Sequence, residues 1–215
     1  MKSSALFWMS ALFLLLVNVT SARNAGAAGA GGLRLLVLGD SLVAGYGLAA
    51  NEAFPEQLQQ VLRAAGRQVT VINAGVSGDT TAGGLARLDW ALTDRPDVVI
   101  VELGGNDALR GLPPEQTRNN LEGIIVKLRQ AGADILLTGM LAPRNLGSEY
   151  YTKFDNLYPE LATKHDLPLY PFFLDGVAGD PALNLEDGIH PNARGVAIIV
   201  TRILPYVEKL IDSSR

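Results

Sequence analysis

Short apolar segments recur along the chain from residue 33 onward, and each is followed by a stretch with apolar residues at helical spacing. The runs 98–101 and 135–137 are apolar without interruption, which is typical of strands buried on both faces of a parallel sheet. Successive segments start 36, 29, 36 and 33 residues apart, the length of a strand followed by a helix. The strands that this pattern predicts cover residues 33–38, 69–73, 98–103, 134–140 and 167–171.

Three helices are predicted between and after these strands. Two of them carry an apolar face and end at Gly66 and Gly132; the faces comprise Phe54, Leu58, Val61, Leu62 and Ala65 in one helix and Leu121, Ile124, Ile125, Leu128 and Ala131 in the other. The last helix is expected to start at the cap Asn192 and to kink or restart at Pro205. The alternation of strands and helices predicts one three-layer α/β domain over residues 33–215.

The first 32 residues are expected to lie outside this domain. Lys2 precedes an apolar stretch at residues 5–17, and the small residues 20–22 follow it, which is the pattern of a secretory signal cleaved after Ala22 or a few residues later. Residues 23–32 are mostly Ala and Gly and read as a flexible leader. A retained membrane anchor is the alternative, but the apolar core is shorter than the ~20 residues of a spanning helix. We therefore expect a periplasmic or secreted protein without a stable membrane anchor.

The amino-acid composition excludes several kinds of site and argues against one class of partner. The 215 residues contain no Cys, which excludes disulfides, a lipoprotein anchor, zinc–thiolate and iron–sulfur sites and a Cys nucleophile. The 18 Lys and Arg against 22 Asp and Glu give a net charge of −4, which argues against nucleic acid as a partner. Only two histidines occur. His165 follows Lys164 at the end of a predicted helix, where a cation suits the helix dipole, so we expect a structural role for it.

Four clusters of polar residues and glycine stand after the first three strands and before the last helix. They are Gly39-Asp40-Ser41, residues 73–80, residues 104–107 and residues 187–191. In an open parallel sheet, ligands bind outside the carboxyl ends of the strands, so these clusters are expected to face one crevice. Each cluster alone also has an ordinary structural interpretation as a helix cap, a βα loop or a turn.

Together the clusters suggest acyl-transfer chemistry. A Ser at the start of a helix, as at Ser41, presents both a hydroxyl and a free N–H. The Gly pair before Asn106 frees the backbone to aim a carboxamide N–H into the crevice. Asp187 stands three residues before His190, so its carboxylate can accept the Nδ1–H of that imidazole and leave Nε2 as a base.

The four clusters resemble the four motif blocks of the SGNH (GDSL-type) hydrolases, and the resemblance runs from residue 33 to about residue 210. It is closest to the TesA-like subgroup of thioesterases, lysophospholipases and arylesterases, since the chain also contains Gly84-Leu85-Ala86-Arg87-Leu88 and Leu109-Arg110-Gly111 and the longer run Val101-Glu102-Leu103-Gly104-Gly105-Asn106-Asp107. The resemblance implies a flavodoxin-like α/β/α sandwich with a five-stranded parallel sheet. It also implies a monomer that needs no cofactor or metal and acts on small acyl ester or thioester substrates.

Carried over residue by residue, the resemblance makes Ser41 the nucleophile, His190 the general base and Asp187 the residue that orients His190. The oxyanion hole would comprise the N–H groups of Ser41 and Gly78 and the side chain of Asn106. Gly75-Val76 and the segment 141–147 depart from the subgroup and leave the acyl preference open. Leu109 is interpreted either as a wall for the acyl chain or as a core residue.

The sequence also bears on other classes of protein with an α/β fold. The G-x-S-x-G pentapeptide of common α/β-hydrolases and the G-x-G-x-x-G of dinucleotide-binding domains are both absent. A secreted, non-catalytic flavodoxin-like binding module would be expected to lack part of the catalytic set, which is complete here. A carbohydrate deacetylase with the same catalytic residues stays open as an alternative.

Overall fold

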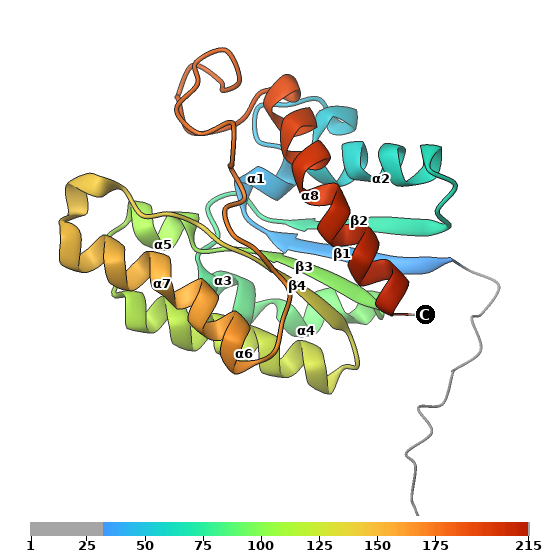
Figure 1. Cartoon of the computed structure of the whole chain (residues 1–215), viewed down its shortest axis with the longest axis horizontal. Helices are drawn as coiled ribbons and strands as arrows, with labels where there is room; N and C mark the ends of the chain where they lie inside the picture. The colour runs from blue at the N-terminus through green and yellow to red at the C-terminus, as the bar shows by residue number, and fades with distance from the viewer. Residues whose placement is uncertain (1–31, 215) are drawn as a thin grey trace, which may run out of the picture.

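A computed structural model describes residues 32–214 of the chain (Figure 1). The expected signal segment, residues 1–22, lies outside the described residues, as does the expected leader, residues 23–32, apart from Gly32. None of the helices in the described part combines the length and the apolar character needed to cross a bilayer.

Five parallel strands form one sheet in the order β2-β1-β3-β4-β5. The strands are β1 (Leu33–Gly39), β2 (Val69–Gly75), β3 (Val98–Glu102), β4 (Asp134–Thr138) and β5 (Leu169–Tyr170). This is the doubly wound order of flavodoxin-like folds. The predicted fold class and strand number are therefore confirmed.

The strand ends differ from the sequence prediction, most of all in β5. That strand has two residues because Pro168 and Pro171 flank it, and proline has no N–H to extend the pairing. Strand β4 stops at Thr138, two residues earlier than predicted, and Gly139 then donates to the carbonyl of Tyr170 at 2.8 Å. The β4–β5 edge of the sheet is thus held by few backbone hydrogen bonds, while β1 and β3, each paired on both sides, form its centre.

Helices cover both faces of the sheet. In Figure 1, α2 and α8 lie on one face and α3, α4, α6 and α7 on the other. The longer helices are α2 (Phe54–Ala64), α6 (Pro114–Gln130), α7 (Ser148–Lys164) and α8 (Ala193–Ser213), and the shorter ones are α1 (Ser41–Ala44), α3 (Thr81–Ala86), α4 (Leu88–Ala91) and α5 (Gly105–Leu109). Because helices cover both faces, the residues of β3 are buried along the whole strand.

Helix α8 starts as predicted, but Pro205 does not end it. The Asn192 side chain caps the helix by accepting from the N–H groups of Arg194 at 3.0 Å and Gly195 at 3.1 Å. The helix runs unbroken from Ala193 to Ser213 with Pro205 inside it. Its buried face continues on both sides of the proline, through Ile199, Val200, Ile203 and Val207, so packing against the core maintains the helix there.

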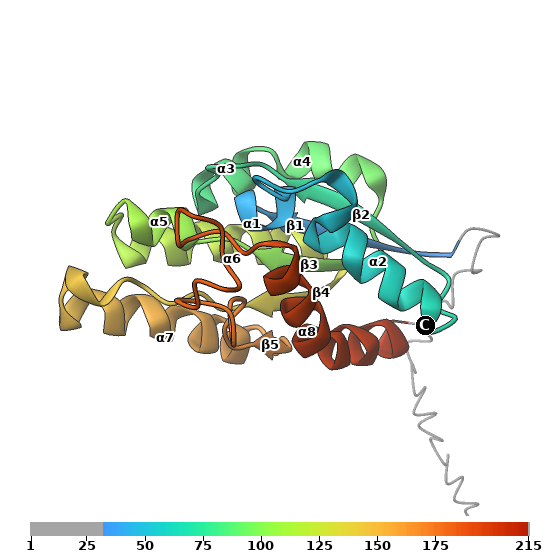
Figure 2. The same cartoon turned by 90° about the horizontal axis from the view of Figure 1, so that it is seen from above.

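The strand order places the polar clusters around one crevice. The chain passes from β1 outward to β2 and then returns to β3 on the other side of β1, so the loops after β1 and β3 diverge. Such a switch point opens a crevice at the carboxyl ends of the strands. Figure 2 shows the segment before α8 running beside α1 at this same end. All four clusters therefore meet there.

Candidate active site

The turn after β1 places Ser41 at the carboxyl edge of the sheet. Strand β1 ends at Gly39, and Ser41 is the first residue of α1. The Asp40 side chain caps this helix, with Oδ1 accepting the N–H of Leu42 at 3.0 Å. A Cβ on Gly39 would lie 2.3 Å from Cγ2 of Val43 and 2.7 Å from Oε2 of Glu102. Only glycine therefore fits between β3 and the helix, and this close approach holds Ser41 at the edge.

The segment before α8 folds back on itself around Asp187. Its Oδ1 accepts the N–H groups of Ile189 at 2.9 Å and His190 at 3.0 Å. Its Oδ2 lies 2.7 Å from Nδ1 of His190. These backbone N–H groups, together with the imidazole, lower the pKa of Asp187 to about 2. Asp187 is therefore ionised at neutral pH and holds the imidazole proton on Nδ1.

The free side of the imidazole faces Ser41. Nε2 of His190 lies 2.9 Å from Oγ of Ser41, across a sequence separation of 149 residues. The side chains of Asp187, His190 and Ser41 thus form one continuous line of hydrogen bonds. The structure brings together the three residues that the sequence indicated as catalytic, in the geometry of a nucleophile, a base and an orienting carboxylate.

Tyr46 also belongs to this site, although the sequence analysis did not identify it. Its ring centroid lies 4.5 Å from that of His190, with the planes tilted by 36°. The side chain is 53% exposed and stands in the loop after α1. In the sequence, Tyr46 is marked only by its position between Gly45 and Gly47. Two flanking glycines indicate a turn, and they do not indicate a contact with His190, far along the chain.

Two of the three expected oxyanion donors are backbone N–H groups without an acceptor. Gly78 adopts φ +85°, a conformation that favours glycine, and its carbonyl accepts from Nη2 of Arg110 at 2.8 Å. Within residues 32–214, neither the N–H of Gly78 nor that of Ser41 donates a hydrogen bond to another residue. Both groups are therefore available to a ligand.

The third expected donor, Asn106, is already hydrogen-bonded on both sides. Its Nδ2 donates to Oδ2 of Asp40 at 2.9 Å and to the carbonyl of Asp79 at 3.0 Å. The amide joins the turn that carries Ser41 to the loop that carries Gly78. An oxyanion in this crevice would share one of these N–H groups rather than meet a free one.

A half-buried ion pair and a set of buried hydrogen bonds fix the loops behind these donors. Arg87 binds Oδ2 of Asp79 through Nε at 2.6 Å and the carbonyl of Gly39 through Nη2 at 2.9 Å. The fully buried Asp107 accepts from the N–H of Thr81 at 2.8 Å and from its hydroxyl at 2.5 Å, and Thr117 adds a third bond at 3.2 Å. These bonds tie the starts of α3, α5 and α6 together beside the loop that carries Gly78.

Exposed apolar side chains stand in the loops and short helices that follow the strands. Leu109, at the end of α5, is 54% exposed, so its interpretation as a core residue is wrong. The set comprises Tyr46, Val76, Leu109, Leu141, Leu146 and Ile189. An apolar acyl group would find apolar contacts in this region.

His165 lies away from the crevice. It is the C-cap of α7, and its Nε2 contacts Oε1 of Glu122 at 3.0 Å. Lys164 and His165 together lower the pKa of Glu122. The predicted structural role for this histidine is consistent with that contact.

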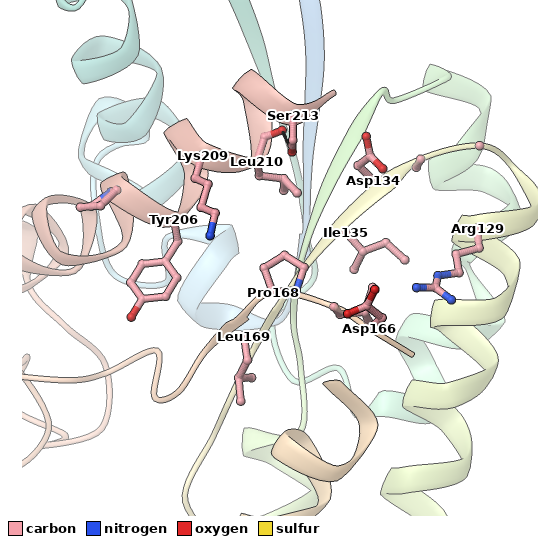
Figure 3. Close-up of a pocket in the computed structure, with 14 residues that line it drawn as sticks. Arg129, Asp134, Ile135, Asp166, Pro168, Leu169, Tyr206, Lys209, Leu210 and Ser213 are labelled. Atoms are coloured by element: carbon pink, nitrogen blue, oxygen red, sulfur yellow. Dashed lines mark hydrogen bonds between the residues drawn. The ribbon is translucent and has the colours of Figure 1, made fainter. Parts of the chain in front are cut away.

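An open groove of about 1030 Å³ lies at the other end of the sheet, where β4 and β5 begin (Figure 3). Arg129 on α6 and Lys209 on α8 line it from opposite sides, and they point to different parts of the groove (Figure 3). The polar groups of this groove do not converge on one point, unlike those around Ser41.

Comparisons with known proteins find relatives of this chain in both sequence and fold. The model of the GDSL-like Lipase/Acylhydrolase family matches residues 37–198. The chain is 43% identical to the arylesterase of Vibrio mimicus, over 74% of this chain and 80% of that protein. It is 41% identical to thioesterase 1/protease 1/lysophospholipase L1 of Escherichia coli, over 83% and 85% of the two chains. The crystal structure of TesA superimposes with a TM-score of 0.79 at 40% identity, covering 82% of this chain and 99% of that chain.

Proposed function

The chain belongs to the GDSL-like lipase/acylhydrolase family and is a hydrolase of ester bonds, and we propose that it cleaves carboxylic esters and thioesters through Ser41, His190 and Asp187. One observation carries the assignment of these residues. The hydrogen bonds from Asp187 to His190, at 2.7 Å, and from His190 to Ser41, at 2.9 Å, align a hydroxyl with a base and an ionised carboxylate. No other pair of a histidine and a hydroxyl is in hydrogen-bond contact within residues 32–214.

The proposed reaction has two acyl-transfer steps. As Oγ of Ser41 attacks the carbonyl carbon, its proton passes to Nε2 of His190, and Asp187 stabilises the resulting imidazolium. The tetrahedral intermediate then expels the alcohol or thiol, which takes that proton, and the acyl group remains on Ser41. Water next attacks the acyl-enzyme while His190 again accepts and returns a proton. The carboxylic acid leaves and Ser41 is restored.

The charge that develops on the carbonyl oxygen is proposed to be stabilised by the N–H groups of Ser41 and Gly78 and by the amide of Asn106. We expect Asn106→Ala to lower kcat about 100-fold to 1000-fold, the usual cost of one oxyanion donor, with KM little changed. Steady-state kinetics on p-nitrophenyl butyrate measure this loss. A variant with wild-type kcat would remove Asn106 from the oxyanion hole.

Activity should fall as the pH decreases, with one ionisation. A protonated imidazole cannot accept the Ser41 proton, so the rate is lost as His190 becomes protonated. Asp187 contributes no second ionisation near neutral pH, because its pKa of about 2 keeps it charged there. The acid limb of log kcat/KM should therefore have a slope of 1. A slope of 2, or a flat profile with chemistry rate-limiting, would contradict this assignment.

The substrate class is proposed to be aryl and short to medium acyl esters, acyl-CoA and lysophospholipids. The similarity to an arylesterase and to a thioesterase and lysophospholipase supports it, as do the exposed apolar side chains beside the crevice. The test compares purified enzyme on p-nitrophenyl acetate, longer p-nitrophenyl esters, acyl-CoA, lysophospholipid and acetylated xylan. Cleavage of the acyl esters supports the proposal. Deacetylation of the xylan without cleavage of acyl chains would favour a carbohydrate deacetylase.

We further propose that residues 1–22 direct export to the periplasm or the medium, that residues 23–32 form the leader, and that residues 33–215 act as a monomeric domain. The support for the signal is its charge and hydropathy pattern, and one chain supplies all three residues of the proposed triad. N-terminal sequencing of the exported protein locates the cleavage site. An unprocessed, membrane-bound chain would favour the anchor alternative.

A further inference from the structure

A buried glutamate lies directly behind the nucleophile turn and has no part in the reaction written above. Glu102 is the last residue of the central strand β3 and is 0% exposed. Its Oε2 accepts the N–H of Asp40 at 3.3 Å, a long contact, and its Oε1 is buried without a hydrogen-bond partner in the part of the chain that the structure describes. Gly39 leaves the space through which this side chain reaches the turn, since a Cβ there would meet Oε2 at 2.7 Å. The fold thus holds a carboxyl group at the base of the site.

The surroundings of Glu102 favour its neutral form. It forms no ion pair within the described residues, and its charged neighbour is a second carboxyl group, that of Asp40. Burial raises the pKa of Glu102 well above its usual range, and the charge of Asp40 raises it further. Tyr158, on α7, cannot supply a proton to Glu102 because its hydroxyl donates to the carbonyl of Leu103 at 3.0 Å.

Asp40, in contrast, has the partners of a carboxylate. Burial raises the pKa of Asp40 above its usual range, although the N–H of Leu42, the amide of Asn106 and the charge of His190 act in the opposite direction. Asp79 is the other charged group that acts on it, and Arg87 already binds Asp79. Within the described residues, the Asp40 side chain accepts hydrogen bonds at 2.9 and 3.0 Å, whereas Glu102 accepts only the long one, so a proton held between the two carboxyl groups is expected to favour Glu102.

We propose that Glu102 and Asp40 share one proton, so that a neutral Glu102 donates to the Asp40 carboxylate and thereby positions Asn106 and the start of α1 for catalysis. The Asp40 carboxylate accepts a hydrogen bond from each of them: Oδ2 accepts from the amide of Asn106 at 2.9 Å, and Oδ1 accepts from the N–H of Leu42 in α1 at 3.0 Å. Glu102 is thus a positioning residue, and this role rests on the oxyanion assignment proposed above. Without its proton, two adjacent carboxylates would repel each other and displace Asp40 from Asn106.

The test compares two substitutions at Glu102. Glu102→Gln keeps the shape and an N–H donor toward Asp40, so we expect its kcat to stay within about 3-fold of wild type. Glu102→Leu removes the donor, and we expect kcat to fall about 10-fold to 100-fold with KM little changed, less than for loss of an oxyanion donor itself. The matched control is Thr138→Val, which removes a buried hydroxyl of β4 that binds the carbonyl of Val101 at 3.1 Å. It should lower stability and leave kcat unchanged.

A spectroscopic readout tests the shared proton apart from activity and apart from the folding of the leucine variant. At pH 8, the infrared difference spectrum of wild type minus Glu102→Gln should show the carbonyl stretch of one protonated carboxyl group. Absence of that band would overturn the proposal. A folded Glu102→Gln variant with as large a loss of kcat as Glu102→Leu would also overturn it, and so would a Glu102→Leu variant with wild-type kcat. If the wild-type enzyme cleaved no ester at all, the proposed function would fail instead. The infrared band would still show whether Glu102 carries a proton.

Discussion

Ser41→Ala should hydrolyse p-nitrophenyl butyrate about 10⁴-fold or more slowly than the wild-type enzyme, in kcat/KM. The hydroxyl is the atom that forms the covalent bond, so its loss removes the two-step route, and only binding and oxyanion stabilisation of an attacking water remain. Within residues 32–214, the side chain of Ser41 has one hydrogen bond, to His190, so the fold should tolerate alanine. Steady-state kinetics and the melting temperature of the same preparation measure the two effects separately.

Ser148→Ala is the matched control for this variant. Ser148 is the exposed first residue of α7, and its hydroxyl makes no hydrogen bond within residues 32–214. We expect wild-type kinetics for it. Near-native hydrolysis by Ser41→Ala, measured on enzyme free of wild-type contamination, would show that another residue is the nucleophile.

His190→Ala should lose a similar factor, about 10⁴-fold or more in kcat/KM. Without the imidazole, the Ser41 hydroxyl has no base within hydrogen-bond distance among the described residues, since Asp187 reaches the hydroxyl only through His190. The chain provides its own control, because His165 is the other histidine. His165→Ala removes a contact with Glu122 at 3.0 Å, far from Ser41 in the fold, and should change kcat/KM less than about 2-fold.

The pair of histidine variants separates catalysis from folding. Both should give folded protein by circular dichroism, and only His190→Ala should be inactive. Equal losses in the two variants would mean that the effect is structural, and a fully active His190→Ala would remove the proposed base.

The sequence predicted the centre of the sheet better than its edge. The buried run of β3 was visible because helices cover both faces of a central parallel strand, which leaves no polar face to interrupt the apolar pattern. Strand β5 was predicted three residues too long, because pairing there is limited by Pro168 and Pro171 rather than by hydrophobicity. The continuity of α8 through Pro205 was also outside the reach of local rules, since the packing of the whole buried face maintains that helix.

Contacts of the site between residues close in the sequence could be predicted, and contacts between residues far apart in the sequence could not be predicted from local pattern. Asp187 and His190 are three residues apart, so their contact follows from a turn, and the 2.7 Å distance agrees with that prediction. The contact of His190 with Ser41 spans 149 residues, and the family resemblance, rather than periodicity, indicated it. Asn106 was expected to aim a carboxamide N–H into the crevice, but its contacts could not be read from the sequence: Nδ2 donates to the Asp40 side chain and to the carbonyl of Asp79.

Glu102 illustrates the limit most clearly. A glutamate at the end of an apolar run is normally taken as the point where a strand reaches solvent. Here the side chain is fully buried, because the turn after β1 closes over it. Only the three-dimensional arrangement of β1 and β3 shows that a second carboxyl group faces it, so its proposed role could not be inferred from its position in the sequence.

Trapping of the acyl-enzyme tests the central claim most directly. The enzyme is mixed with excess p-nitrophenyl butyrate and quenched in acid within the first turnovers, and the intact protein and its peptides are weighed by mass spectrometry. The two-step mechanism predicts a protein heavier by one butyryl group, with the added mass on the peptide that contains Ser41, and no added mass in Ser41→Ala. An adduct on a different residue, or one that persists in Ser41→Ala, would contradict the assignment of Ser41 as the nucleophile.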